Sequence, residues 1–142
     1  MNHRKIKQPL YDLMESFLDL PSAHIKDEGF KTHIIDTMKV RYSQVEPQTY
    51  GWQLWTTISI TVWKGCDLAT VIETMLHELT HLVIAVVLMI ADKVEVHGSE
   101  FWELHSVLAM EAFPQLGEIH LTTYDQLSQL LRERIPWISQ AY

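Results

Sequence analysis

The feature that most limits the fold is the apolar stretch from Leu68 to about Ala91, which contains the pattern H-E-x-x-H. Asp67 stands immediately before this stretch and is a suitable N-cap, so the spacing of the apolar residues predicts one long helix. Positions 74–83 carry no charge other than Glu78 and no proline, which is typical of a buried helix. The rest of the chain has to build its core around this helix.

The H-E-x-x-H pattern places two histidines and a glutamate on one side of the predicted helix. Four helical residues advance about 6 Å and turn about 400°, so the imidazoles of His77 and His81 can bind the same cation. Glu78 lies beside that cation, where a general base is needed to take a proton from a water on the metal. The pattern therefore predicts a zinc-dependent hydrolase with one catalytic Zn²⁺ ion.

A catalytic zinc needs three protein ligands and an open position for water. We predict that His97 is the third ligand, because it precedes Gly98 and opens a second helix that can dock beside the first. Glu100 and Glu103 on that second helix are the competing ligands, and they would make a glutamate-type zinc site.

Two further residues are candidates for stabilising a reacting carbonyl group. His105 stands eight residues after His97, about 12 Å away in a helix, so both cannot bind one zinc. The favoured interpretation of His105 is a hydrogen-bonded core histidine, and a role towards substrate is the alternative. Tyr124 is the other candidate. The sequence does not decide between them.

The remaining segments predict an α+β domain. Helical patterns occur near residues 10–18, around residues 29–36, from Gly98 to before Pro114, and up to Pro136. The runs "TMKVRYSQV" and "WTTISITVW" alternate as strands do, and "YGWQLW" is a third, shorter candidate. We expect a zincin-like metallopeptidase fold, in which a small antiparallel sheet of two or three strands packs on helices.

Size and composition limit the other classes of protein. The chain has 142 residues and 16.6 kDa, with 47% hydrophobic and 20% charged residues, which predicts a single domain over residues 1–142. Cys66 is the only cysteine, so zinc must be held by histidine and carboxylate, and a cytoplasmic location is expected. The longest apolar run, Leu82 to Ala91, is shorter than the roughly 20 residues of a membrane span. We expect it to be a buried core helix, and we expect no membrane association.

The charge distribution indicates which kinds of partner the protein can bind. The formal net charge is −7, and from Gly65 to Leu131 ten acidic residues face one basic residue, Lys93. Basic residues are more frequent near the N-terminus, but acidic residues are mixed among them, and phosphate binding needs a clustered positive surface. The sequence therefore gives weak support to DNA as a partner.

The runs "TISITVW", "VIETMLHELTH" and "HGSEF", in that order, resemble the SprT-like (Spartan-type) zinc metallopeptidases. The resemblance is specific from Thr57 to about Leu108. It implies that His77, His81 and His97 are zinc ligands and that Glu78 is the catalytic base. Many relatives continue into a cysteine-rich zinc module that helps to bind DNA, and this sequence lacks the cysteines for it. The resemblance therefore implies a peptidase core, without the zinc-ribbon module.

Three functions follow as hypotheses. The first is a zinc endopeptidase that cleaves protein or peptide substrates, with substrate extended along the free edge of the strand near Ile58 to Trp63. The alternative is a non-catalytic or restrained zinc-binding protein that uses the same cleft to bind a partner. A third is a peptidase acting on DNA-associated proteins. The oligomeric state is not predicted.

Overall fold

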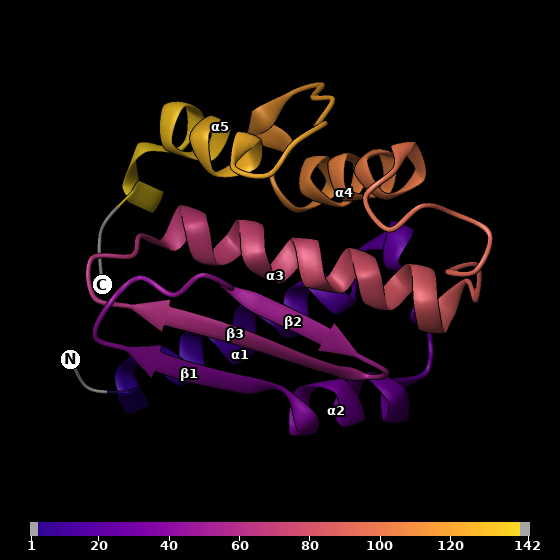
Figure 1. The fold of residues 1–142 in the computed structure, drawn as a ribbon, viewed down its shortest axis with the longest axis horizontal. Helices are drawn as coiled ribbons and strands as arrows, with labels where there is room; N and C mark the ends of the chain where they lie inside the picture. Colours follow the sequence, from indigo (N-terminus) through magenta and orange to yellow (C-terminus); the bar gives the residue numbers. More distant parts are fainter. Residues whose placement is uncertain (1–2, 140–142) are drawn as a thin grey trace.

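The computed structural model describes residues 3–139, in which two α-helices precede a small sheet of consecutive strands and three α-helices follow it (Figure 1). Within the described part of the chain there are three strands and five α-helices, as expected for an α+β fold. The helices are α1 (His3–Leu18), α2 (Glu28–Thr37), α3 (Leu68–Leu82), α4 (Ser99–Ala112) and α5 (Gln126–Arg134). The strands are β1 (Lys39–Ser43), β2 (Gly51–Leu54) and β3 (Thr57–Trp63).

The sheet is mixed, so the prediction of an antiparallel sheet is wrong. The strand order is β1-β3-β2, and β3 pairs parallel with β1 and antiparallel with β2. The connection over residues 44–50 crosses the position of one strand, a distance of about 10 Å, and a tight hairpin then returns the chain through β3. β3 is therefore the central strand, with hydrogen-bonding partners on both sides.

This topology also corrects the expected substrate edge. The segment Ile58 to Trp63 lies within β3 and has no free edge, because both of its edges are paired. β2 is an edge strand, and it lies against α3 (Figure 1). Any peptide that extends the sheet next to α3 would have to pair with β2.

α3 is the central element of the fold. It lies between the sheet on one side and α4 and α5 on the other (Figure 1). Its N-cap is Asp67, as predicted, and the Asp67 side chain accepts a hydrogen bond from the Thr70 N–H at 3.0 Å. Arg132 of α5 donates to both carboxylate oxygens of Asp67, at 2.6 and 3.0 Å. The first turn of α3 is thus fixed to α5.

The α-helix ends earlier than predicted. After Leu82 the chain forms a π-helical turn over Val83–Val87 and then leaves the helix, so the expected continuation to Ala91 is wrong. Four of the five residues in that turn are β-branched, which weakens the α-helical preference there. Met89 then adopts a left-handed conformation, with φ of 57°. Because Leu88 and Met89 are exposed, the second half of this apolar run is surface rather than core.

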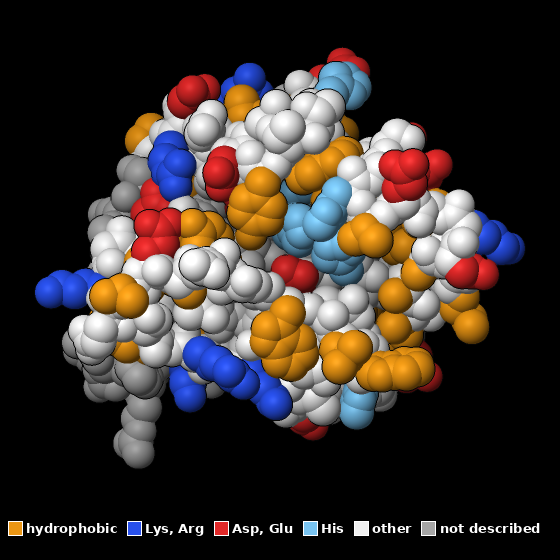
Figure 2. Space-filling view, viewed as in Figure 1, with side chains coloured by type: hydrophobic (Ala, Val, Ile, Leu, Met, Phe, Trp, Pro, Cys, Tyr) orange, Lys and Arg blue, Asp and Glu red, His pale blue; other side chains and the backbone are white. Residues whose placement is uncertain are grey.

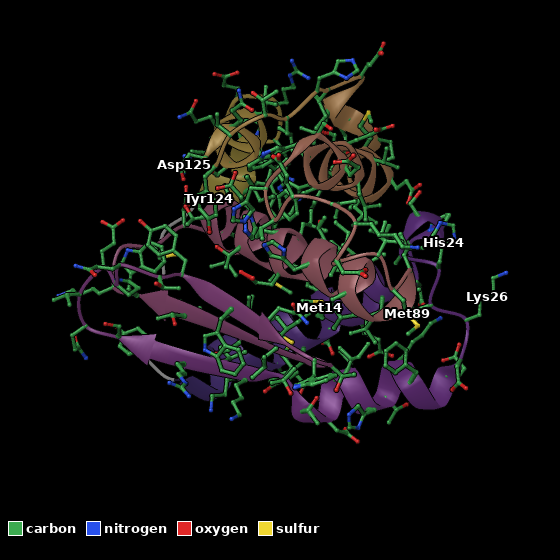
Figure 3. All side chains as sticks on the ribbon, turned by 45° about the vertical axis from the view of Figure 1, so that its right-hand side comes forward. Met14, His24, Lys26, Met89, Tyr124 and Asp125 are labelled. Carbon is green, nitrogen blue, oxygen red and sulfur yellow. The ribbon has the colours of Figure 1, made fainter. Side chains whose placement is uncertain are left out.

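The helical segment Leu68–Val87 is long and apolar enough to cross a membrane by length and composition. However, 72% of it is buried inside the protein, as in the core helix of a globular domain. The core beneath α3 contains α1, whose Leu10, Met14 and Leu18 are almost fully buried. Figure 3 shows Met14 in this interior position. Burial of α3 on several sides holds its polar side chains in fixed places.

Candidate metal centre and cleft

Three imidazoles meet beside the C-terminal half of α3. His77 and His81 are one turn apart on this helix, and His97 comes from the connection that precedes α4. The Nε2 atom of His97 lies 3.0 Å from that of His81 and 3.2 Å from that of His77. The Nε2 atoms of His77 and His81 are also 3.2 Å apart. The three histidines are therefore close enough to bind one metal ion.

The geometry and protonation of these histidines fit a small divalent metal ion. A tetrahedral site with metal–nitrogen distances of about 2.0–2.1 Å places its nitrogens roughly 3.3 Å apart, close to the observed spacing. Burial, together with the neighbouring histidines, lowers the pKa of His77 to about 2 and that of His81 to about 4. Both imidazoles are thus neutral at physiological pH, which is the form that binds metals.

His97, rather than a glutamate, completes the group of potential ligands. Glu100 and Glu103, the competing candidates, are exposed on α4 and lie outside the cluster of three histidines. Gly98 follows His97 and permits the turn into α4, because a Cβ there would lie 2.8 Å from Cβ of Glu95. The structure therefore brings together the three histidines that the sequence analysis favoured.

His77 is oriented by packing rather than by a hydrogen bond. Its Nδ1 atom is buried and has no hydrogen-bond partner in residues 3–139, whereas metal-binding histidines usually donate this N–H to a neighbour. The ring of Phe101 from α4 lies 4.8 Å from the His77 ring, and the ring of Tyr124 lies 4.9 Å away, as centroid distances. These contacts fix the imidazole between α4 and the start of α5.

Glu78 lies beside the histidines and is buried, with 6% of its surface exposed. Burial raises the pKa of its carboxyl group to about 7. Since Glu78 also lines the cleft, a group with this pKa can take up and release a proton there near neutral pH. This position and pKa are suitable for a general base.

Gly51 of β2 allows the strand to approach Glu78 closely. A Cβ at position 51 would lie 2.7 Å from Cγ2 of Thr74, 2.8 Å from the carbonyl oxygen of Ser59 and 3.3 Å from Cγ of Glu78. Only glycine fits this contact without displacing its neighbours. The absence of a side chain thus places the edge strand directly beside the glutamate.

An open cleft runs past these residues between β2 and the upper helical layer. It has a volume of about 690 Å³ and is lined by residues from the β1–β2 connection, β2, α3, the α3–α4 connection and the start of α5. Figure 2 shows histidines and a carboxylate at the bottom of a hollow in this face, with hydrophobic side chains on its rims. An extended chain can enter such a cleft from either end.

Tyr124 and Asp125 line the cleft at the start of α5, above α3 (Figure 3). They are held by Glu73, a residue that sequence reasoning missed. Its carboxylate is 2% exposed and accepts the backbone N–H of Asp125 at 3.1 Å and that of Ser128 at 3.2 Å. Burial raises the pKa of Glu73 to about 7, although these N–H groups act in the opposite direction. The signal in the sequence was a second carboxylate in an apolar helix, one turn before His77.

His105 is a core residue, as the favoured interpretation predicted. It is 1% exposed, its Nδ1 atom lies 3.4 Å from Oγ1 of Thr80, and its ring stacks on Phe101. Burial lowers its pKa to about 3. Among the residues that line the cleft, Tyr124 is present and His105 is not. Of the two candidates for contacting a substrate carbonyl, only Tyr124 is therefore accessible.

Comparison with known proteins adds no further assignment, because no family model, curated protein or solved structure matches this chain.

Proposed function

We propose that this protein is a zinc-dependent endopeptidase of the SprT-like, zincin type. The observation that carries the proposal is the combination of three converging histidines with a buried carboxylate in the same open cleft. A structural metal site is normally closed by a fourth protein ligand, whereas this group offers three histidines and opens to solvent. Zinc is favoured because neutral imidazoles suit it and three histidines form a known type of catalytic site.

Each of these side chains has a separate role in the proposed reaction. A zinc ion held by His77, His81 and His97 supplies Lewis-acid activation of water and of a carbonyl group. The Glu78 carboxylate accepts the proton of the attacking water and delivers it to the leaving amine. Tyr124 can donate its hydroxyl proton to a substrate oxygen, since burial and nearby carboxylates raise its pKa and keep it protonated.

The substrate is proposed to bind as an added strand along β2. This strand has a free edge, lies beside Glu78 at Gly51 and lines the cleft with residues 51–53. Backbone hydrogen bonds to an edge strand bind an extended peptide of any sequence. Because the cleft is open to solvent, the scissile bond can lie within a longer chain, which favours an endopeptidase.

The direct test compares the wild type with Glu78→Gln, using unfolded casein and one equivalent of zinc. We expect chelator-sensitive fragments from the wild type and a fall in rate of about 10²- to 10⁴-fold in the variant, with zinc binding retained. Glu100→Gln is the matched control and should cleave like the wild type. If Glu78→Gln cleaves casein as fast as the wild type, Glu78 is not the general base. Repeating the assay with double-stranded DNA at two salt concentrations tests whether DNA is an activator.

The second candidate is a zinc-binding protein without catalysis that uses the cleft to hold a partner. It is favoured by the exposed position of His97, which a bound partner could cover. Stoichiometric zinc binding with no cleavage of casein would support it. Under either function, the single buried cysteine and the burial of α3 support a cytoplasmic location.

A further inference from the structure

A smaller pocket opens beside the histidines, at the C-terminal end of α3. It has a volume of about 140 Å³. Five of its eight lining residues are apolar, namely Ile84, Ala85, Ala91, Val94 and Val96, and the other three are Gln53, His81 and Glu95. Ile84 and Ala85 come from the π-helical turn, and the remaining three apolar residues come from the connection to α4. The early end of the α-helix thus creates this pocket.

The pocket is continuous with the metal centre. His81, Gln53 and Val96 line both this pocket and the main cleft. Gln53 belongs to β2, so a peptide paired with this strand would pass the mouth of the pocket. Figure 2 shows hydrophobic side chains continuing from the histidine cluster towards the right-hand side of this face. Because His81 is a wall of both, the pocket adjoins the position of a bond held at the histidines.

The opposite end of the cleft has a different character. There the lining residues include Tyr50, Tyr124 and Asp125, which carry hydroxyl and carboxylate groups. Figure 3 shows Tyr124 and Asp125 well separated from Met89, which follows the π-helical turn. A substrate would thus meet polar groups on one side of the scissile bond and apolar walls on the other.

Resting on the proposed peptidase activity, we propose that this pocket is a specificity subsite for one large apolar side chain next to the scissile bond. An apolar cavity of about 150 Å³ is large enough to hold benzene, so 140 Å³ accommodates leucine, methionine or phenylalanine. Burial of such a side chain stabilises the bound peptide, and a difference of a single methylene group in an apolar pocket can change kcat/KM by about 10- to 200-fold. The proposed substrates are therefore unfolded protein segments, in which apolar residues that are normally buried have become accessible.

The test uses peptides that differ at one position next to the cleaved bond, carrying leucine, alanine or lysine. We expect kcat/KM for leucine to exceed that for alanine by at least about tenfold. Ala91→Phe and Ala85→Phe would fill the pocket from opposite walls, and both positions are exposed, so the core is not disturbed. Each should lower kcat/KM for the leucine peptide at least about tenfold and change the alanine peptide less than about threefold. Val45→Phe, at an exposed site outside both pockets, is the control and should change neither.

A binding measurement separates failure of the subsite from failure of the peptidase proposal. Calorimetry on the zinc-loaded protein should show tighter binding of acetyl-leucine hydroxamate than of acetyl-alanine hydroxamate, with the difference lost in Ala91→Phe. This result would support the subsite even if no peptide is cleaved. Equal affinities of the two hydroxamates, a preference for lysine, or an equal loss for both peptides in Ala91→Phe would overturn the subsite.

Discussion

The two regions that supply the histidines are built in opposite ways. Every residue from Val71 to Thr80 on α3 is buried, whereas none of residues 85–98 is buried. His77 is thus held by a packed helix, while His97 is held at the end of an exposed connection. Segments with few buried contacts open locally at lower free energy than packed helices. We therefore expect α3 to be the rigid half of the candidate site, and the connection to be the half whose order depends more on a bound metal ion.

The largest effects are expected when one histidine is removed from either half of the site, and the two variants should differ in stability. His77→Ala and His97→Ala should each lower zinc affinity and activity by more than about 10³-fold, because each removes one of three ligands. In the metal-free protein, His77→Ala should also cost about 1–3 kcal/mol of unfolding free energy by leaving a cavity in the core. His97→Ala should cost less than about 0.5 kcal/mol, because its side chain is exposed.

Zinc titration and chemical denaturation of the metal-free variants would check this difference. Equal destabilisation by the two substitutions would contradict the division into a packed and an exposed half.

A smaller effect is expected where β2 contacts α3, the packed half of the site. Gly51→Ala should destabilise the protein by about 1–3 kcal/mol and move β2 away from Glu78, because the added Cβ overlaps Thr74 and Ser59. Gly29→Ala in α2 is the matched control. It should change the stability by less than about 1 kcal/mol, since alanine favours a helix while its Cβ would lie 3.1 Å from Oδ1 of the N-cap Asp27. Thermal unfolding of both variants gives the comparison, and a neutral Gly51→Ala would show that the strand is not closely packed there.

An effect of similar size, which depends on pH, is expected at Glu73. Because burial raises the folded-state pKa of Glu73 from 4.5 to about 7, the folded protein binds this proton more tightly than the unfolded chain. The resulting stability is present below pH about 4.5 and is lost as the pH rises through about 7. The unfolding free energy of the wild type, relative to Glu73→Gln, should therefore fall by roughly 1–3 kcal/mol between these pH values.

Denaturation of the metal-free proteins at several pH values would measure this difference. Glu118→Gln, at an exposed carboxylate, serves as the control. A difference that rises with pH would mean that the N–H groups of Asp125 and Ser128 outweigh burial.

Much of the candidate site could be predicted because it depends on local spacing. The positions of His77, Glu78 and His81 follow from the helical repeat, and the N-cap Asp67 follows from the same pattern. The sequence favoured His97 over Glu100 and Glu103 as the third ligand but did not decide between them. The path of the connection between α3 and α4 cannot be derived from the spacing of residues. The group around Glu73 was missed, since its partners lie more than 50 residues away in the sequence.

The sheet shows why the rest of the fold was harder to predict. Alternation with a period of two is the same in parallel and antiparallel strands, so the pattern could not reveal that β1 and β3 run parallel. The same limit led to the prediction that β3 has a free edge, although β3 is the central strand and β2 is an edge strand. The end of α3 was also misplaced, because an apolar run continues beyond Leu82 while its residues become exposed.

X-ray absorption spectroscopy of the protein loaded with one equivalent of zinc shows directly whether His77, His81 and His97 bind the metal. We expect three imidazole nitrogens and one further oxygen ligand at about 2.0 Å. The spectrum should lose one imidazole in His97→Ala and stay unchanged in Glu100→Gln and Glu103→Gln. Coordination by a carboxylate in place of the His97 imidazole, or a closed site with four protein ligands, would contradict this prediction.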